Sequence, residues 1–170
     1  MQVLKKAGFA LLALAFPLTA AAQWSIGTGY ANLSSDDDGL DVSLSAVYGS
    51  VSYYHKIENT QWTVTPELRF GIGLNDDEVF DVDFEIDRFV ALSVKGQYQA
   101  ADNFYLFVMP SYADVKIEAS FRGSSASDSE SELGYGVGAG FNITEQSLLE
   151  FSFEQYDDTD LLTASIHMKF

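Results

Sequence analysis

Strict alternation at the end of the chain is the feature that most constrains its fold. From Leu162 to Phe170 every second residue is apolar, and the positions between them are mostly polar. A period of two predicts a β-strand with one apolar face and one mostly polar face. Because similar alternating segments recur along the chain, the sequence predicts an all-β fold.

Eight alternating segments are separated by short turns or by acidic connectors. The predicted strands are residues 24–33, 40–54, 62–73, 79–98, 104–121, 133–143, 148–156 and 161–170. We expect a bulge near Gly49, where the alternation becomes unclear, and a poorly paired position at Pro66, which lacks a backbone donor. The even positions of the fourth strand stay in one phase up to Tyr98, with Arg88 as the charged exception. The registers within residues 49–57 and 104–113 stay open.

The first 22 residues have the pattern of an export signal. Lys5 and Lys6 precede an apolar run at residues 8–18, and three alanines at 20–22 supply small residues for cleavage. The run is too short for a transmembrane helix. We therefore predict a signal peptide at residues 1–22 and a single mature domain at residues 23–170.

The composition is strongly acidic. The chain carries a formal charge of −16, and loss of the two leader lysines would change it to −18, with seven basic against 25 acidic residues. Such a charge excludes nucleic acid as a partner class, since phosphate contacts need clustered lysine and arginine. The chain has no cysteine, so an exported domain of this size must be held by its sheet and not by disulfides. No residue pattern indicates a cofactor.

The connectors favour a barrel in lipid over a soluble β-protein. Those after the first, third, fifth and seventh strands are acidic, and the fifth, at residues 122–132, is the longest. Polar loops on one side and short turns on the other are typical of outer-membrane barrels, whose closure leaves no unpaired edge in lipid. We predict an eight-stranded antiparallel up-and-down transmembrane β-barrel in the cell outer membrane, with its apolar faces toward lipid. A soluble exported sandwich or lipocalin-type barrel, with the apolar residues inside, is the alternative.

Two segments carry a family resemblance. One is the glycine-alternating strand at residues 134–141, and the other is the closing segment at residues 164–170. With the leader, they make residues 23–170 resemble the OmpA/OmpX-type family of small eight-stranded outer-membrane barrels. The resemblance implies that the outer-membrane assembly machinery reads the last strand and its terminal Phe170 as an assembly signal. No peptidoglycan-binding domain follows the barrel, so that part of the OmpA role is not expected.

Charged residues on the face opposite the apolar one are the candidate site. Glu67, Arg69, Lys95, Glu150 and Glu154 are predicted to form an ion-pair network in the lumen, because charges enclosed there must be paired. We favour a network that plugs the barrel over a gated path for protons or ions. The glycines at 134, 136, 138 and 140 are interpreted as small lumen-facing residues, since their spacing of two does not fit a nucleotide-binding loop.

The remaining motifs point to no chemistry. The acidic connectors at residues 36–38, 76–78 and 157–160 are oxygen-rich enough for Ca²⁺ or Mg²⁺, but we favour a solvated acidic rim. A lipid-cleaving triad needs serine, histidine and a carboxylate in reach of one another. His55 is predicted in a periplasmic turn and His167 inside the barrel near the periplasmic end, with no supporting serine pattern. We therefore predict no catalytic residue and no metal site.

The sequence thus predicts a monomeric, non-catalytic outer-membrane protein with a structural or surface-interaction role. Part of the long fourth and fifth strands should stand above the membrane, and with the acidic loops it would form the contact surface. The expected partners are outer-membrane lipids, lipopolysaccharide and the assembly machinery. A narrow porin-like channel is the alternative function, and a lipid A-modifying enzyme is the third. Single-channel conductance tests for the channel, and incubation with lipid A tests for the enzyme.

Overall fold

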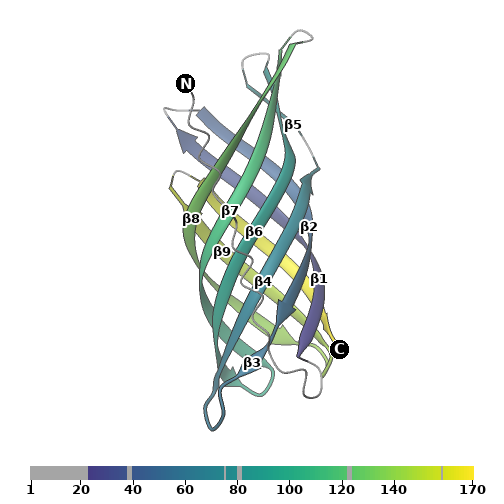
Figure 1. Cartoon of the computed structure of the whole chain (residues 1–170), viewed down its shortest axis with the longest axis vertical. Helices are drawn as coiled ribbons and strands as arrows, with labels where there is room; N and C mark the ends of the chain where they lie inside the picture. Colours follow the sequence, from purple (N-terminus) through teal and green to yellow (C-terminus); the bar gives the residue numbers. More distant parts are fainter. Residues whose placement is uncertain (1–22, 38–39, 75, 80–81, 122–123, 158) are drawn as a thin grey trace, which may run out of the picture.

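In the computed structural model, the chain forms a closed barrel of antiparallel strands (Figure 1). The structure describes residues 23–37, 40–74, 76–79, 82–121, 124–157 and 159–170. The strands are β1 (Trp24–Asp37), β2 (Leu40–Tyr53), β3 (His55–Lys56), β4 (Trp62–Gly73), β5 (Asp76–Val79), β6 (Val82–Ala101), β7 (Phe104–Phe121), β8 (Ser124–Asn142), β9 (Ser147–Tyr156) and β10 (Thr159–Lys169). Within the described ranges, no helix is long and apolar enough to cross a membrane.

Eight long strands make the wall of the barrel. From β6 to β10 each strand pairs with the next, β10 pairs with β1, and the ring continues through β2 and β4 back to β6. The two short strands extend the sheet, β3 beside β4 and β5 beside β6. The predicted eight-stranded antiparallel up-and-down barrel is confirmed. The C-terminus and β3 lie toward one end of the barrel and β5 toward the other (Figure 1).

The outer wall is apolar over most of the barrel, as the alternation predicts. In β4, Leu68, Phe70 and Ile72 are exposed, whereas Glu67 and Arg69 are buried inside. Aromatic rings gather at the β3 end in three cross-strand pairs: Trp24–Tyr53, Trp62–Tyr98 and Phe104–Phe141. A belt of this kind suits the interface between hydrocarbon and water.

A sheet rises beyond the rest of the barrel at the β5 end (Figure 1). β7 and β8 stay paired up to Phe121 and Ser124, whereas the pairing of β8 with β9 begins only at Tyr135. We call β5, residues 82–88 of β6, 114–121 of β7 and 124–133 of β8 the protruding sheet. The prediction of a flexible connector over residues 122–132 is wrong for 124–132, which form a strand. Its odd positions are all serine and its even positions are mainly acidic, so both faces are polar and no alternation of apolar with polar residues marks it.

A bulge in β6 reverses the direction of its side chains. Ile86 and Arg88 pair with consecutive residues of β7, which leaves Asp87 as an extra residue. Ile86 is therefore buried in the lumen, although Leu92, six residues later, faces outward. The prediction of a single phase along this strand is wrong, because one inserted residue exchanges the two faces.

The irregularities expected in β2 and β4 have different outcomes. Gly49 sits in a continuous register with β1, so the predicted bulge there is wrong. Pro66 lies at a break in pairing, as predicted. β2 and β3 both pair with the edge of β4 that faces away from β6. The pairing with β2 ends at Glu67 and the pairing with β3 begins at Val64. A residue without an N–H group is tolerated at such a break.

The lumen contains a polar layer and two apolar clusters, of which the one toward the β3 end consists of Tyr105, Phe107, Met109 and Leu148. The layer toward the β5 end is apolar and consists of Ala31, Leu44, Ala46, Tyr48, Ile86, Phe89, Ala91, Ala113, Tyr156 and Leu161. The expectation that apolar faces point to lipid is therefore wrong for the first half of β2, where Leu44 and Tyr48 are buried and Val47 is exposed. An eight-stranded barrel is narrow enough to be occupied largely by side chains, and in this part of it those side chains are apolar.

The glycine face of β8 makes room for bulky side chains of its neighbours. A methyl group on Gly138 would overlap the Phe107 ring and lie 2.5 Å from the carbonyl oxygen of Phe151. We expect Gly138→Ala to lower the free energy of unfolding by about 1–3 kcal/mol, because the wall must shift to accept the methyl group. Gly96→Ala is the matched control, since its methyl would meet Val108 at 3.9 Å. Urea unfolding in detergent micelles measures both, and equal losses would contradict this account.

Candidate functional site in the barrel lumen

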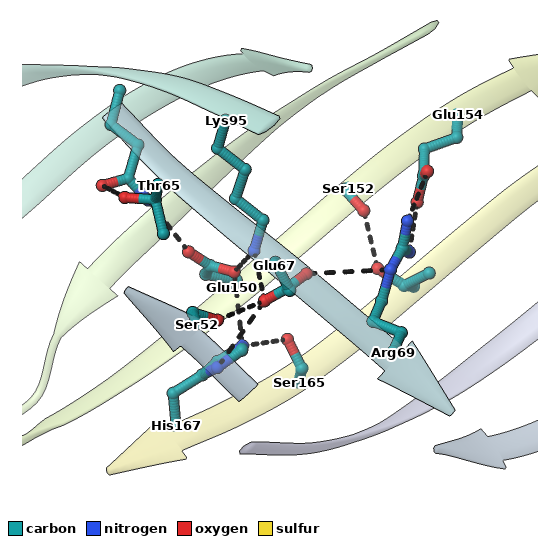
Figure 2. Close-up of polar contacts among 12 residues, drawn as sticks. Ser52, Thr65, Glu67, Arg69, Lys95, Glu150, Ser152, Glu154, Ser165 and His167 are labelled. Carbon is teal, nitrogen blue, oxygen red and sulfur yellow. Dashed lines mark hydrogen bonds and ion pairs between the residues drawn. The ribbon is translucent and has the colours of Figure 1, made fainter. Parts of the chain in front are cut away.

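The five charged residues predicted for the lumen lie together in its polar layer. Glu67 and Arg69 come from β4, Lys95 from β6, and Glu150 and Glu154 from β9. Each is at most 3% exposed, and Figure 2 shows their side chains converging. Alternation explains the placement, because each residue is in phase with the other inward-facing residues of its strand.

Lys95 joins two carboxylates. Its ammonium group donates to Oε2 of Glu67 at 2.9 Å and also to the carboxylate of Glu150. Ser52 donates a further hydrogen bond to Glu67 at 2.8 Å, and Tyr105 donates one to Glu150 at 2.7 Å. Both carboxylates are therefore paired with a cation and hydrogen-bonded, which is what burial of an ion requires.

Arg69 and Glu154 form a second, bidentate pair. Nη1 and Nη2 of Arg69 donate to Oε1 and Oε2 of Glu154 at 2.5 and 2.7 Å. The hydroxyl of Tyr156 donates to the same Oε2 at 2.8 Å. Nε of Arg69 lies 3.7 Å from Oε1 of Glu67, so the two pairs belong to one connected layer (Figure 2). The parallel geometry fixes the guanidinium as well as balancing its charge.

His167 completes the polar layer, although the sequence did not assign it to the network. Its Nε2 lies 3.3 Å from Oε2 of Glu150, and its Nδ1 lies 4.0 Å from Oε2 of Glu67. Two signals in the sequence were available: the inward phase of His167 on β10, and the position of Glu150 on the neighbouring strand β9, where it pairs with Ser165. Sequence reasoning also missed uncharged partners of the network, among them Ser52, Thr65, Gln97, Tyr105 and Tyr156.

Hydroxyl, imidazole and carboxylate groups do meet in the lumen. Oγ of Ser165 lies 2.9 Å from Nε2 of His167, a pair that the sequence pattern did not reveal. The distance of 4.0 Å from His167 to Glu67 is too long for the orienting hydrogen bond of a triad. All three residues are at most 5% exposed, and His55, on β3, lies outside this layer. The arrangement does not present a nucleophile to lipid.

The polar layer pairs each of its carboxylates with a basic side chain. Glu67, Glu150 and His167 form the group among the described side chains whose ligand atoms approach closely enough, within 4.8 Å, to hold a metal ion. Lys95 already donates to both of these carboxylates, so a metal ion would have to displace it. Three carboxylates thus face Arg69, Lys95 and an imidazole, an arrangement that fills the barrel with fixed ion pairs.

The other predicted positions lie away from this layer. Phe170 is 66% exposed, and its N–H group donates to the carbonyl oxygen of Trp24 at 2.9 Å. In the acidic connectors, Asp157 and Asp160 are exposed. The side chains at residues 36–38, 76–78 and 158 lie outside the described residues, as do residues 1–22.

Known proteins share this architecture. A family model described as "Outer membrane protein beta-barrel domain" matches residues 8–169. Ail, the attachment invasion locus protein of Yersinia pestis, is 20% identical with a TM-score of 0.63, covering 88% of this chain and 98% of its own. Neisserial surface protein A is 12% identical with a TM-score of 0.67, covering 89% and 100%.

A third solved structure is also similar to this chain. The N-terminal β-barrel domain of Pseudomonas aeruginosa OprF is 12% identical with a TM-score of 0.61, covering 88% of this chain and 100% of that domain. No curated protein sequence matches the chain. At these identities the solved structures establish a shared fold.

Proposed function

The chain belongs to the outer membrane protein beta-barrel domain family and lies in the outer membrane, and on that premise we propose that it is a non-catalytic surface protein. Its protruding sheet binds extended, basic segments of partner molecules. The barrel anchors this sheet as a monomer among outer-membrane lipids and lipopolysaccharide. We also propose that residues 1–22 are a signal peptide and that Phe170 serves the assembly machinery.

The observation that carries this proposal is an open strand edge above the barrel wall. Residues 124–134 of β8 pair with β7 on one side, and no other described strand pairs with their opposite side. Such an edge offers backbone N–H and C=O groups to an incoming strand. A partner segment can therefore extend the protruding sheet by one strand.

The charge of the protruding sheet specifies the partner. Residues 76–88 and 114–132 contain twelve acidic and three basic residues. Two of the basic residues are already engaged, since Arg88 pairs with Asp114 at 2.8 Å and Lys116 pairs with Asp87 at 2.7 Å. Hydrogen bonds from Ser131 and Arg88 lower the pKa of Asp114 below its ordinary value. The surface therefore stays negative and favours basic partners.

The same charge disfavours other ligand classes. Ail has been solved in complex with the heparin analogue sucrose octasulfate, but a sulfated glycan would be repelled by the acidic surface of this chain. A solute channel is also disfavoured, because the ion pairs of the buried polar layer close the lumen. Neither alternative uses the open edge of β8.

The test is to shorten the protruding sheet without touching the barrel. Residues 118–127 are replaced by Asn-Gly, so that Ile117 and Asp128, which pair in the native register, flank a tight turn. An immobilised extended peptide of alternating lysine and threonine serves as the probe, with the protein in lipid nanodiscs. We expect binding to fall by about tenfold or more, equivalent to about 1.4 kcal/mol.

Two controls separate edge pairing from charge. The shortened variant should keep the heat-modifiable gel mobility of the folded barrel. A second variant, Asp128→Asn with Glu130→Gln, keeps the strand and removes two charges, so it should lose mainly the salt-sensitive part of the binding. Undiminished binding by the shortened variant would refute the proposal.

A further inference from the structure

The apolar layer contains a cavity at the mouth of the barrel, which we call the cup. It has a volume of about 100 Å³ and is lined by residues from seven strands. Its walls are mainly apolar, with Leu44, Phe89, Ala113 and Leu161 among them. Each of these four side chains is at most 5% exposed, so the walls are held in place by the packing of the barrel.

The floor of the cup is closed by the Arg69–Glu154 pair. Tyr156 lines the cup and donates its hydroxyl hydrogen bond to Glu154 beneath. The guanidinium of Arg69 lies 5.9 Å from the ring centre of Phe89, which also lines the cup. Because this pair is fixed by two hydrogen bonds, the cup is blind toward the periplasmic end and faces the protruding sheet.

Two carboxylates complete the lining on the side of β8. Glu130 and Glu132 lie two residues apart and therefore on the same face of the strand. Glu130 is exposed and Glu132 is half-buried. The cup thus combines an apolar, aromatic interior with negative charge at its entrance, in a chain whose formal charge of −16 attracts cations.

We propose that the cup binds a small amphiphilic cation, whose single apolar ring packs against Phe89 and Leu161 while its ammonium group lies beside Glu130 and Glu132. The size supports this class, since an engineered apolar cavity of about 150 Å³ stays dry and accepts benzene. An acyl chain of a lipid is too long for a blind cavity of this volume.

The test uses benzyltrimethylammonium as the probe. Phenylacetate keeps the ring and reverses the charge, and tetramethylammonium keeps the charge and lacks the ring. Saturation-transfer NMR with the protein in zwitterionic lipid nanodiscs reports binding of all three. We expect benzyltrimethylammonium to bind about tenfold more tightly than either control compound, because only it satisfies both the walls and the entrance.

Variants assign the binding to the cup. Ala113→Leu and Val115→Phe each fill the cavity from β7, and at least one should fold and abolish binding of the probe. Glu130→Gln with Glu132→Gln should weaken binding about tenfold and leave the barrel intact. Leu106→Met, on the lipid-facing side of β7, is the control and should bind normally. Unchanged binding in a folded filled variant, or equal binding of phenylacetate, would overturn the proposal.

Discussion

Arg69→Met is expected to lower the free energy of unfolding by about 3–5 kcal/mol. Glu154 has no exposed surface and receives two hydrogen bonds from Arg69. Removal of the guanidinium leaves this carboxylate in a closed layer, where the hydroxyl of Tyr156 still donates to it but no cation balances its charge. The loss of stability arises from the unpaired, buried charge of Glu154. An intact buried ion pair contributes much less net stability than is lost when one of its partners is removed.

The double variant Arg69→Met with Glu154→Leu tests that explanation. It removes both charges and keeps the volume roughly constant, so most of the lost stability should return. Reversible urea unfolding in micelles, followed by the fluorescence of Trp24 and Trp62, gives the free energies. A double variant no more stable than Arg69→Met would mean that Arg69 acts through its packing and not through its charge.

Lys95→Met is expected to have an effect of similar size at pH 8, about 3–5 kcal/mol. It leaves Glu67 and Glu150 without the ammonium group that both of them contact. Both carboxylates are at most 3% exposed, so water cannot replace the lost ammonium group and the full penalty of two buried, unpaired charges remains.

The control for this prediction is Lys56→Met, which removes an exposed lysine of β3 and should change stability by less than about 0.5 kcal/mol. In Lys95→Met with Glu150→Gln, part of the lost stability should return, because one of the two carboxylates that Lys95 contacts no longer carries a charge. Unfolding curves at pH 8 measure both effects. If the second substitution restored no stability, the unpaired charge of Glu150 would not be a source of the loss.

Alternation predicted the fold where one strand face meets lipid and the other meets a different environment. β4 and β10 are such strands, and their inward and outward residues lie as expected. The method failed at residues 124–132, where both faces are polar, and in the first half of β2, where the lumen is as apolar as the wall. A period of two identifies the two faces of a strand but cannot say which face is inside when both environments are alike.

The candidate site could be predicted only in part for a related reason. The inward phase of Glu67, Arg69 and Glu154 follows from their own strands. Which carboxylate meets Arg69 depends on the tilt and stagger of β4 relative to β9 across the barrel, and no local pattern encodes that relation. The bulge at Asp87 could not be predicted from a local pattern either, because a bulge is set by the pairing of two strands.

The seam between β1 and β10 has a consequence for how the molecule comes into being. Residues 25–35 near one terminus pair with residues 159–169 near the other. During synthesis, the first strand therefore has one edge without a hydrogen-bonding partner until the last strand has been made. Contacts between residues so far apart in sequence form slowly, and an exposed strand edge can pair with strands of other chains. Closure of the barrel is therefore a single late step in folding. A chaperone that accompanies the unfolded chain must cover the unpaired edge of β1 until that step.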